Sequence, residues 1–131
     1  MPHITVEYSA NVREAIELGA LIKVLHDTAI GTGVFPPGGT RTRAAERSDY
    51  RIADAHPDNG FVHIQVRIGH GRDDATRRRA AQALFDAAKA HLATLFGKAP
   101  LAISLEMEQI DPMTSFKHNN IHDYVKQRQS G

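Results

Sequence analysis

The strongest constraint on this fold is a strand, helix, strand pattern that occurs twice within 131 residues. In the second half, residues 61–68 alternate between apolar and polar or aromatic side chains, which is the period of a strand. A helical stripe follows, which either Asp73 or Asp74 can cap and which Gly97 ends. Its members are Ala81, Leu84, Phe85, Ala88, Leu92, Leu95 and Phe96. Residues 101–108 alternate again, so the second half is predicted to be strand, helix, strand.

The first half carries the same pattern. Alternation over residues 3–8 predicts a strand, and Asn11 with Glu14 three residues later resembles a capping box, which predicts a helix start there. Apolar residues at helical spacing follow, at Leu18, Leu21, Ile22, Leu25 and Ala29. Glycines at 31 and 33 end this helix, residues 36–39 form a Pro/Gly loop, and residues 40–47 form a strand. Two β-α-β units with right-handed crossovers are expected.

These elements predict an α+β fold with a mixed sheet and two helices on one face. A length of 131 residues with 41% hydrophobic residues suffices for one core, so residues 1–131 are expected to form a single domain. Residues from about 125 to 131 are expected to be a flexible tail.

The face of the sheet away from the helices is predicted to be polar. It would carry His3, Thr5, Glu7, His63, Gln65, Arg67, Ser104, Glu106 and Glu108. One interpretation is a solvated face, which mixed and antiparallel sheets permit. The other is burial in an oligomer, where Arg67 would pair with Glu7, Glu106 or Glu108 because unmatched buried charges are costly.

Composition narrows the classes of partner. A formal net charge of +1 gives no general electrostatic reason to bind nucleic acid or an acidic membrane, so any anion binding must be local. The sequence has no cysteine, which excludes disulfides, thiol nucleophiles and thiolate metal sites. It shows no signal segment and no apolar run near the roughly 20 residues that span a bilayer. We therefore expect a soluble cytoplasmic protein without nucleic-acid or membrane partners.

The second residue offers unusual chemistry. Removal of Met1 would leave Pro2 with a free secondary amine at the end of the first strand. An α-amino group has a pKa of roughly 7.7–8.0, and burial or nearby cations lower it, so this amine could act as a neutral base near pH 7. While Met1 remains attached, the nitrogen is a tertiary amide without basic character. The alternative is that Pro2 has no catalytic role, because proline is common at this position.

Two arginine segments are candidates for binding an anion. Arg41 and Arg43 follow the Pro/Gly loop on one side of an extended segment, and Arg72 ends a Gly-His-Gly-Arg segment after the 61–68 strand. Guanidinium groups suit two-point recognition of carboxylates, and glycines let backbone approach a ligand closely. The alternative is that Arg41 and Arg72 are solvated or paired with Asp49 or Asp73.

Other motifs predict less. His118 and His122 are four residues apart but lack the Glu-led motif of a zinc site, so no metal centre is predicted. The basic run 77–79 lies within a predicted helix without interleaved aromatics, which favours a solvated face over nucleic-acid binding.

Seven segments together resemble the 5-carboxymethyl-2-hydroxymuconate isomerases of the tautomerase superfamily. They are Met1-Pro2-His3, Gly33-Val34-Phe35-Pro36, Thr40-Arg41-Thr42-Arg43, Phe61-Val62-His63, Ile68-Gly69-His70-Gly71-Arg72, Ser104-Leu105-Glu106 and Phe116-Lys117-His118-Asn119-Asn120-Ile121-His122. The resemblance runs from Pro2 to about Tyr124. It implies a β-α-β repeat fold, a homotrimer whose sheets enclose a polar centre, and a cofactor-free isomerase of the homoprotocatechuate (4-hydroxyphenylacetate) meta-cleavage pathway.

The resemblance also assigns roles. Pro2 would be the catalytic base, and Arg41 and Arg72 would bind or polarise a small anionic di- or tricarboxylate. The implied substrate is 5-carboxymethyl-2-hydroxymuconate, converted to its 2-oxo-3-ene tautomer without a metal or cofactor. Further candidate substrate-binding residues are Arg43, Phe35, Phe61 and His3. Pairing of Arg43 with Glu46 or Asp49 would explain that arginine equally well.

Two other functions fit the same residues. One is a generic keto-enol tautomerase acting on another oxaloenoate, which substrate profiling would separate from the muconate isomerase. The other is a non-catalytic trimeric protein that holds carboxylates with Arg41 and Arg72, for which retention of Met1 in the cell would be the distinguishing sign.

Overall fold

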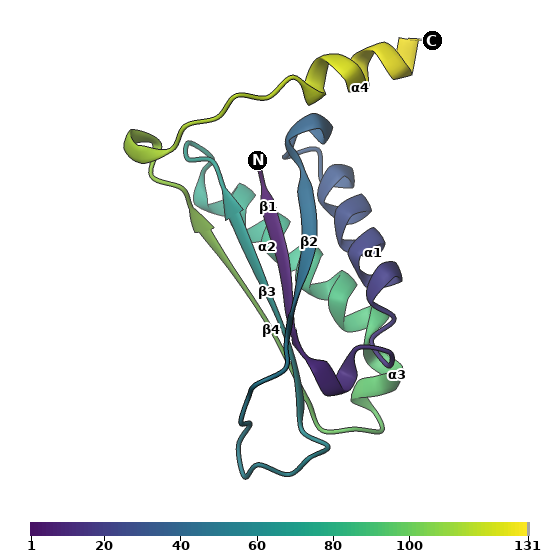
Figure 1. The fold of residues 1–131 in the computed structure, drawn as a ribbon. Helices are drawn as coiled ribbons and strands as arrows, with labels where there is room; N and C mark the ends of the chain where they lie inside the picture. Colours follow the sequence, from purple (N-terminus) through teal and green to yellow (C-terminus); the bar gives the residue numbers. More distant parts are fainter. Residues whose placement is uncertain (131) are drawn as a thin grey trace.

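A computed structural model describes residues 1–130 and contains one four-stranded mixed sheet (Figure 1). Its strands are β1 (His3–Ser9), β2 (Arg41–Arg47), β3 (Gly60–Ile68) and β4 (Leu101–Gln109), in the order β2-β1-β3-β4. β1 pairs with β2 and β3 with β4 in parallel, while the central pair β1 and β3 is antiparallel. The predicted α+β class and the two β-α-β units are therefore confirmed.

The directions of the strands determine which segments lie together at each end of the sheet. In its register His3 lies opposite Arg67, and in the parallel pair His3 lies opposite Arg41. The N-terminus, the start of β2 and the segment that follows β3 consequently gather at one end of the sheet. This end holds the candidate site.

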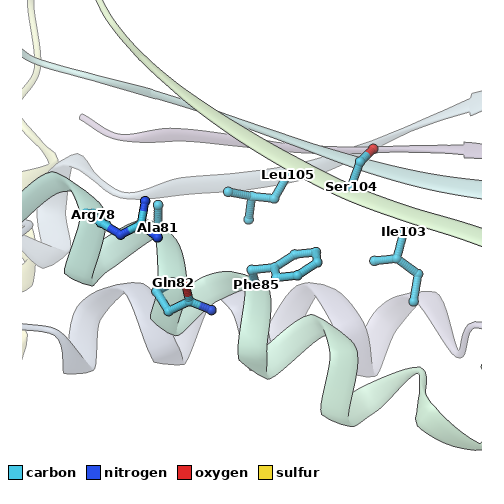
Figure 2. A pocket seen from close by; sticks show the side chains of 7 residues that line it. All are labelled: Arg78, Ala81, Gln82, Phe85, Ile103, Ser104 and Leu105. Carbon is cyan, nitrogen blue, oxygen red and sulfur yellow. The ribbon is translucent and has the colours of Figure 1, made fainter.

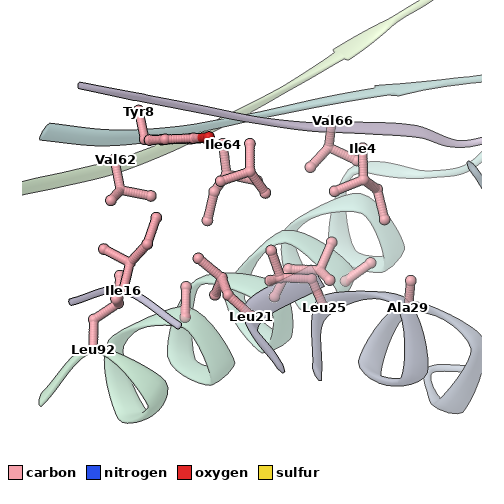
Figure 3. Close-up of a cluster of buried hydrophobic side chains, with 14 of the residues drawn as sticks. Ile4, Tyr8, Ile16, Leu21, Leu25, Ala29, Val62, Ile64, Val66 and Leu92 are labelled. Carbon is pink, nitrogen blue, oxygen red and sulfur yellow. The ribbon is translucent and has the colours of Figure 1, made fainter. Parts of the chain in front are cut away.

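Two long helices, α1 (Leu18–Gly31) and α2 (Asp74–His91), cover one face of the sheet, and the short α3 (Ala93–Phe96) follows α2 (Figure 1). The core lies between the two layers, where alternate strand residues meet the inner sides of the helices (Figure 3). Fully buried members include Ile4, Val6, Val62, Ile64, Leu21, Leu25 and Leu84. Burial of each such side chain contributes about 1.5–3 kcal/mol, so this interface between helices and sheet holds the fold together.

The two predicted helix starts have different outcomes. Asp73 caps α2 as expected, because its carboxylate accepts a 2.7 Å hydrogen bond from the backbone N–H of Thr76. The predicted start at Asn11 is wrong. The Asn11 amide donates instead to the carbonyls of Pro57 and Asn59, at 3.2 and 2.8 Å, and a short 3-10 helix η1 (Ala10–Val12) forms there. α1 begins only at Leu18, since a tertiary hydrogen bond has replaced the local cap.

The predicted stripe of the second helix is also partly wrong. Ala80, Leu84, Ala88, Leu92 and Leu95 form its buried side, whereas Phe96 is 60% exposed. Leu92 leaves helical backbone geometry, at φ −93° and ψ 4°, and separates α2 from α3. The helical period restarts at that point, which turns Phe96 away from the core.

The opposite face of the sheet is polar, as predicted, and several of its charges pair within the chain. Glu7 binds Arg47 at 2.6 Å on the β1 and β2 side, and Glu108 lies 3.5 Å from Arg67 on the β3 and β4 side. His63 lies 2.7 Å from the Ser104 hydroxyl. Each half-exposed ion pair contributes no more than about 1 kcal/mol. Of the partners expected for Arg67, Glu108 is the one observed.

After β4, a segment that we call the arm (residues 110–130) turns back across the end of the sheet that holds the N-terminus (Figure 1). It contains a short 3-10 helix η3 (Pro112–Thr114) and α4 (Ile121–Ser130), which contacts the 3-10 helix η2 (Pro37–Gly39). α4 occupies most of the segment expected to be a tail, none of its described residues is buried, and flexibility there stays a prediction. Within residues 1–130 no helix is long and apolar enough to cross a membrane.

Candidate active site

A cavity of about 540 Å³ lies where the N-terminus, η2, the segment after β3 and the arm meet. Its lining residues are Met1, Pro36, Arg41, Gly69, His70, Arg72, Lys117, His118, Asn119 and His122. Three of these side chains are cationic, three are histidines, and none of the described lining residues is acidic. A smaller cavity of about 160 Å³ adjoins it and shares Met1, Gly69, His70 and Lys117. The arrangement favours a ligand with several negative charges.

The start of the chain is held tightly beside this cavity. Pro2 is buried, and its carbonyl accepts a 3.1 Å hydrogen bond from the backbone N–H of Arg41. Gly39 packs so closely here that a Cβ atom on it would meet the backbone nitrogen of Met1. η2 and the first residue of β2 therefore fix the position of the N-terminal segment.

The cavity favours a neutral amine at the N-terminus. Burial lowers the pKa of the Met1 amine, and the positive charges of Arg41, Lys117 and Arg72 lower it further, in that order. An amine in this place loses its proton at a lower pH than one in solvent. It is thus better suited to accept a proton near neutral pH.

Arg72 is held by backbone carbonyls. Its Nε and Nη2 atoms donate to the carbonyl of Val34, at 3.3 and 3.1 Å, and its Nη1 donates to the carbonyl of Gly69 at 3.2 Å. Its guanidinium carbon lies 5.2 Å from the ring centroid of Phe35. A guanidinium has five N–H donors, so two remain for a ligand. Phe35 is buried beneath Arg72 and supports it, rather than lining the cavity as predicted.

Neither candidate arginine is neutralised by an acidic side chain in the described part of the chain. The six ion pairs found there include neither Arg41 nor Arg72. The alternative pairing of Arg72 with Asp73 is therefore wrong, since Asp73 caps α2 instead. The positive charge of both arginines remains available to an anion.

The other candidates lie outside the cavity. Arg43 and His3 contact each other on the polar face of the sheet, with 3.0 Å between Nη1 and Nδ1. Burial lowers the pKa of His3, and the charge of Arg43 lowers it further, so a neutral ring can accept the hydrogen bond from Arg43. Glu46, one of the partners considered for Arg43, binds Tyr8 and Arg13 instead.

Phe61 is the candidate that the structure places farthest from the others. It lies near the start of β3, opposite Ala102, whereas the cavity is at the end of that strand. Its backbone N–H donates to the hydroxyl of Ser9 at the far end of β1. Phe61 therefore does not line the cavity within this chain.

Sequence reasoning missed the contribution of the arm. Lys117, His118, Asn119 and His122 line the cavity because the Asn119 amide donates to the carbonyl of Gly38 at 3.2 Å and brings the arm onto η2. All four belong to a segment that carried the family resemblance, which was the available signal. His70, in the Gly-His-Gly-Arg segment, also lines the cavity without having been singled out.

A separate cavity, of about 380 Å³, lies between α2 and β4 (Figure 2). Phe85, Ile103 and Leu105 form much of its wall, with Arg78 and Gln82 at its side. Its lining includes one charged side chain, Arg78, whereas three cationic side chains line the cavity at the N-terminus. The N-terminal cavity is therefore the candidate active site.

Comparison with known proteins identifies the fold and the family of this chain. The fold is shared with a crystal structure described as native fused 4-OT, with a TM-score of 0.64, 15% identity, and coverage of 95% of this chain and 98% of that chain. This likeness shows a tautomerase-like fold.

Closer relatives define the family. The profile of the family described as 5-carboxymethyl-2-hydroxymuconate isomerase matches residues 2–125. A 5-carboxymethyl-2-hydroxymuconate Delta-isomerase of Escherichia coli is 38% identical over 126 residues, which cover 96% of this chain and all of that protein. The crystal structure of a 5-carboxymethyl-2-hydroxymuconate isomerase from Deinococcus radiodurans R1 has a TM-score of 0.89 and 33% identity, covering 95% of this chain and 93% of that one. The chain belongs to the 5-carboxymethyl-2-hydroxymuconate isomerase family.

Proposed function

We propose that this protein is a 5-carboxymethyl-2-hydroxymuconate Delta-isomerase, which converts the 2-hydroxy dienol into its 2-oxo-3-ene tautomer. The observation that carries the proposal is the set of three cations, Arg41, Arg72 and Lys117, around a partly buried N-terminal amine in a cavity whose described lining has no acidic side chain. Such a cavity suits a substrate with several carboxylates. The family match over nearly the whole chain supports the same substrate.

Pro2 would be the base, once Met1 has been removed. The amine would then lie one residue farther along the chain, on a residue that is already buried. Burial and the cations that lower the pKa of the Met1 amine would act on this nitrogen too. The neutral secondary amine takes the proton of the 2-hydroxyl group. The C2 oxygen becomes a carbonyl, the double bonds shift, and the amine returns a proton to C5, so no atom or electron is gained or lost.

The two arginines would bind the substrate and stabilise the intermediate. The two free N–H groups of Arg72 can bind a carboxylate, and the carbonyls of Val34 and Gly69 keep its guanidinium in place. Arg41 lies beside the N-terminus and lowers the pKa of the amine there more than the other charges do. The positive charge of Arg41 beside the amine would stabilise the negative charge that develops on the 2-oxygen.

Further expectations come from the family resemblance. We propose that the protein is a cytoplasmic homotrimer in the homoprotocatechuate degradation pathway. In the described chain the sheet has two edge strands, β2 and β4, each paired on one side only. Light scattering of the purified protein would report a mass three times that of the 14.4 kDa chain. A monomeric mass would contradict the trimer and leave the reaction untouched.

The test combines intact mass with ultraviolet monitoring of the conversion of dienol to enone. We expect the wild-type protein to lack Met1 and to convert 5-carboxymethyl-2-hydroxymuconate. Pro2→Ala, which replaces the secondary amine with a primary one, should lower kcat far more than it weakens binding. A fraction that retains Met1 serves as a matched control, because its Pro2 nitrogen is an amide, and it should be inactive.

Other outcomes would identify the alternatives. Loss of Met1 with turnover of simpler enols only would indicate a generic tautomerase. Retained Met1 in native material, with carboxylate binding and no turnover, would indicate a binding protein. Turnover at the wild-type rate by Pro2→Ala would remove the proposed mechanism.

A further inference from the structure

Lys117 is the one of the three cations to which the steps of the proposed reaction assign no role. It lies in the arm between β4 and α4, and it lines both cavities that surround the N-terminus. Its side chain is exposed, and the ion pairs found among residues 1–130 do not include it. Together with Arg41 and Arg72, it is one of three cations that face the same space without an acidic partner in the described chain.

The arm holds Lys117 in this position. Two residues farther on, the Asn119 side chain donates to the carbonyl of Gly38 and accepts a 2.8 Å hydrogen bond from the backbone N–H of Ile121. Asn119 therefore fastens the arm to η2 and also forms an Asx turn that leads into α4. His122 packs directly on Gly38, where any side chain would collide with it. These contacts on one side of Lys117 limit where its exposed ammonium group can reach.

The charge of Lys117 acts on the reacting end of the chain. It lowers the pKa of the Met1 amine more than Arg72 does, although Arg72 is better buried. The proximity agrees with the lining of the two cavities. A lysine whose only role was solubility would have no need to face an amine and two arginines, which repel it.

We propose that Lys117 binds the third carboxylate of the substrate and thereby makes the enzyme prefer tricarboxylates to dicarboxylates. This inference rests on the proposed function. 5-Carboxymethyl-2-hydroxymuconate has three carboxylates, and the cavity offers three cations, one for each. The same dienol without its carboxymethyl group is 2-hydroxymuconate, which has two carboxylates. It would leave one cation without a carboxylate partner, so the charge-assisted hydrogen bond between that cation and the third carboxylate would be lost.

The test measures kcat/KM of Lys117→Met for both dienols, at a pH where the rate no longer depends on pH. We expect about a tenfold loss for the tricarboxylate, mostly in KM, and less than about a threefold loss for 2-hydroxymuconate. Lys117→Arg should keep the preference because it keeps the charge. Lys126→Met is the matched control, since Lys126 lies on α4 but does not line the N-terminal cavity, and it should behave as wild type.

A binding measurement separates this proposal from the reaction itself. Calorimetry measures the affinities for propane-1,2,3-tricarboxylate and for glutarate, which has the same three-carbon chain and two carboxylates. The ratio of the two affinities gives the preference for a tricarboxylate without any turnover. Wild type should prefer the tricarboxylate, and Lys117→Met should lose that preference. Equal losses for both ligands, or no loss, would overturn the role of Lys117 while leaving the isomerase intact. Preference for the tricarboxylate in a protein that converts neither dienol would overturn the proposed function and leave the role of Lys117 as a carboxylate-binding residue supported.

Discussion

Replacement of Gly38 by alanine should displace the arm and lower activity while leaving the core intact. A Cβ atom at this position would lie 2.5 Å from Nδ1 and 2.9 Å from Cα of His122, whereas ordinary contacts begin near 3.4 Å. The ring can rotate away, but the Cα atom belongs to the backbone of α4. The helix must therefore retreat by at least about 0.5 Å, and the hydrogen bond from Asn119 to the Gly38 carbonyl must stretch with it.

The consequence should appear in catalysis rather than in stability. A misplacement of about 1 Å can cost about 10²-fold in rate, so we expect kcat/KM for 5-carboxymethyl-2-hydroxymuconate to fall about tenfold or more in Gly38→Ala. The melting temperature should fall by no more than about 4 °C, because none of the described residues of α4 is buried and the strain can be relieved by movement of the arm.

A matched glycine separates the steric effect from the general effect of the substitution. Gly19 lies in α1, and beyond the helix's own backbone no atom lies within 4 Å of the place that a Cβ would take. Gly19→Ala should therefore leave kcat/KM unchanged and should stabilise the helix by up to about 1 kcal/mol. Wild-type kcat/KM in Gly38→Ala, or equal losses of activity in both variants, would show that the close contact between Gly38 and His122 does not set the position of the arm.

Three further predictions concern charge, capping and packing. Arg41→Gln removes a charge that lowers the pKa of the N-terminal amine, so the acid limb of the kcat/KM profile should move to higher pH than in wild type. Asp73→Ala should lower the melting temperature at pH 7 and have less effect in acid. The Thr76 side chain and then its backbone N–H lower the pKa of the Asp73 carboxyl, and the stabilisation is lost as the pH falls through that value. Asp73→Asn should keep the cap without this pH dependence. Leu84→Ala should cost about 2–5 kcal/mol in urea unfolding, since Leu84 is fully buried.

The parts of the fold that local patterns determine could be predicted from the sequence. Residues 61–68 and 101–108 alternate because one face of each strand packs on helices and the other is polar, and both segments are strands. Asp73 could be identified as a cap because its partner, Thr76, is three residues away. Asn11 was misassigned because its partners, Pro57 and Asn59, are 46 and 48 residues away, and no local pattern shows such a bond.

The same distinction applies to the candidate site. Arg41 and Arg72 could be nominated because each follows a glycine-containing segment beside a strand, and strand order alone brings both to the N-terminus. Lys117 could not be nominated, because its place depends on a hydrogen bond between Asn119 and Gly38, which are 81 residues apart. Phe61 was chosen from a segment that resembles the family. It lies near the start of β3, and because β3 runs antiparallel to β1, this start lies at the end of the sheet away from the N-terminus.

The role of Pro2 as the base is tested most directly by titration of its nitrogen by ¹⁵N NMR in protein labelled at proline, compared with the pH dependence of kcat/KM. We predict a titrating amine whose pKa is lower than in the same protein unfolded in urea. That pKa should coincide with the acid limb of kcat/KM, below which the protonated amine cannot act as a base. A fully active protein whose Pro2 nitrogen does not titrate, or titrates away from the acid limb, would contradict the central claim that this amine is the catalytic base.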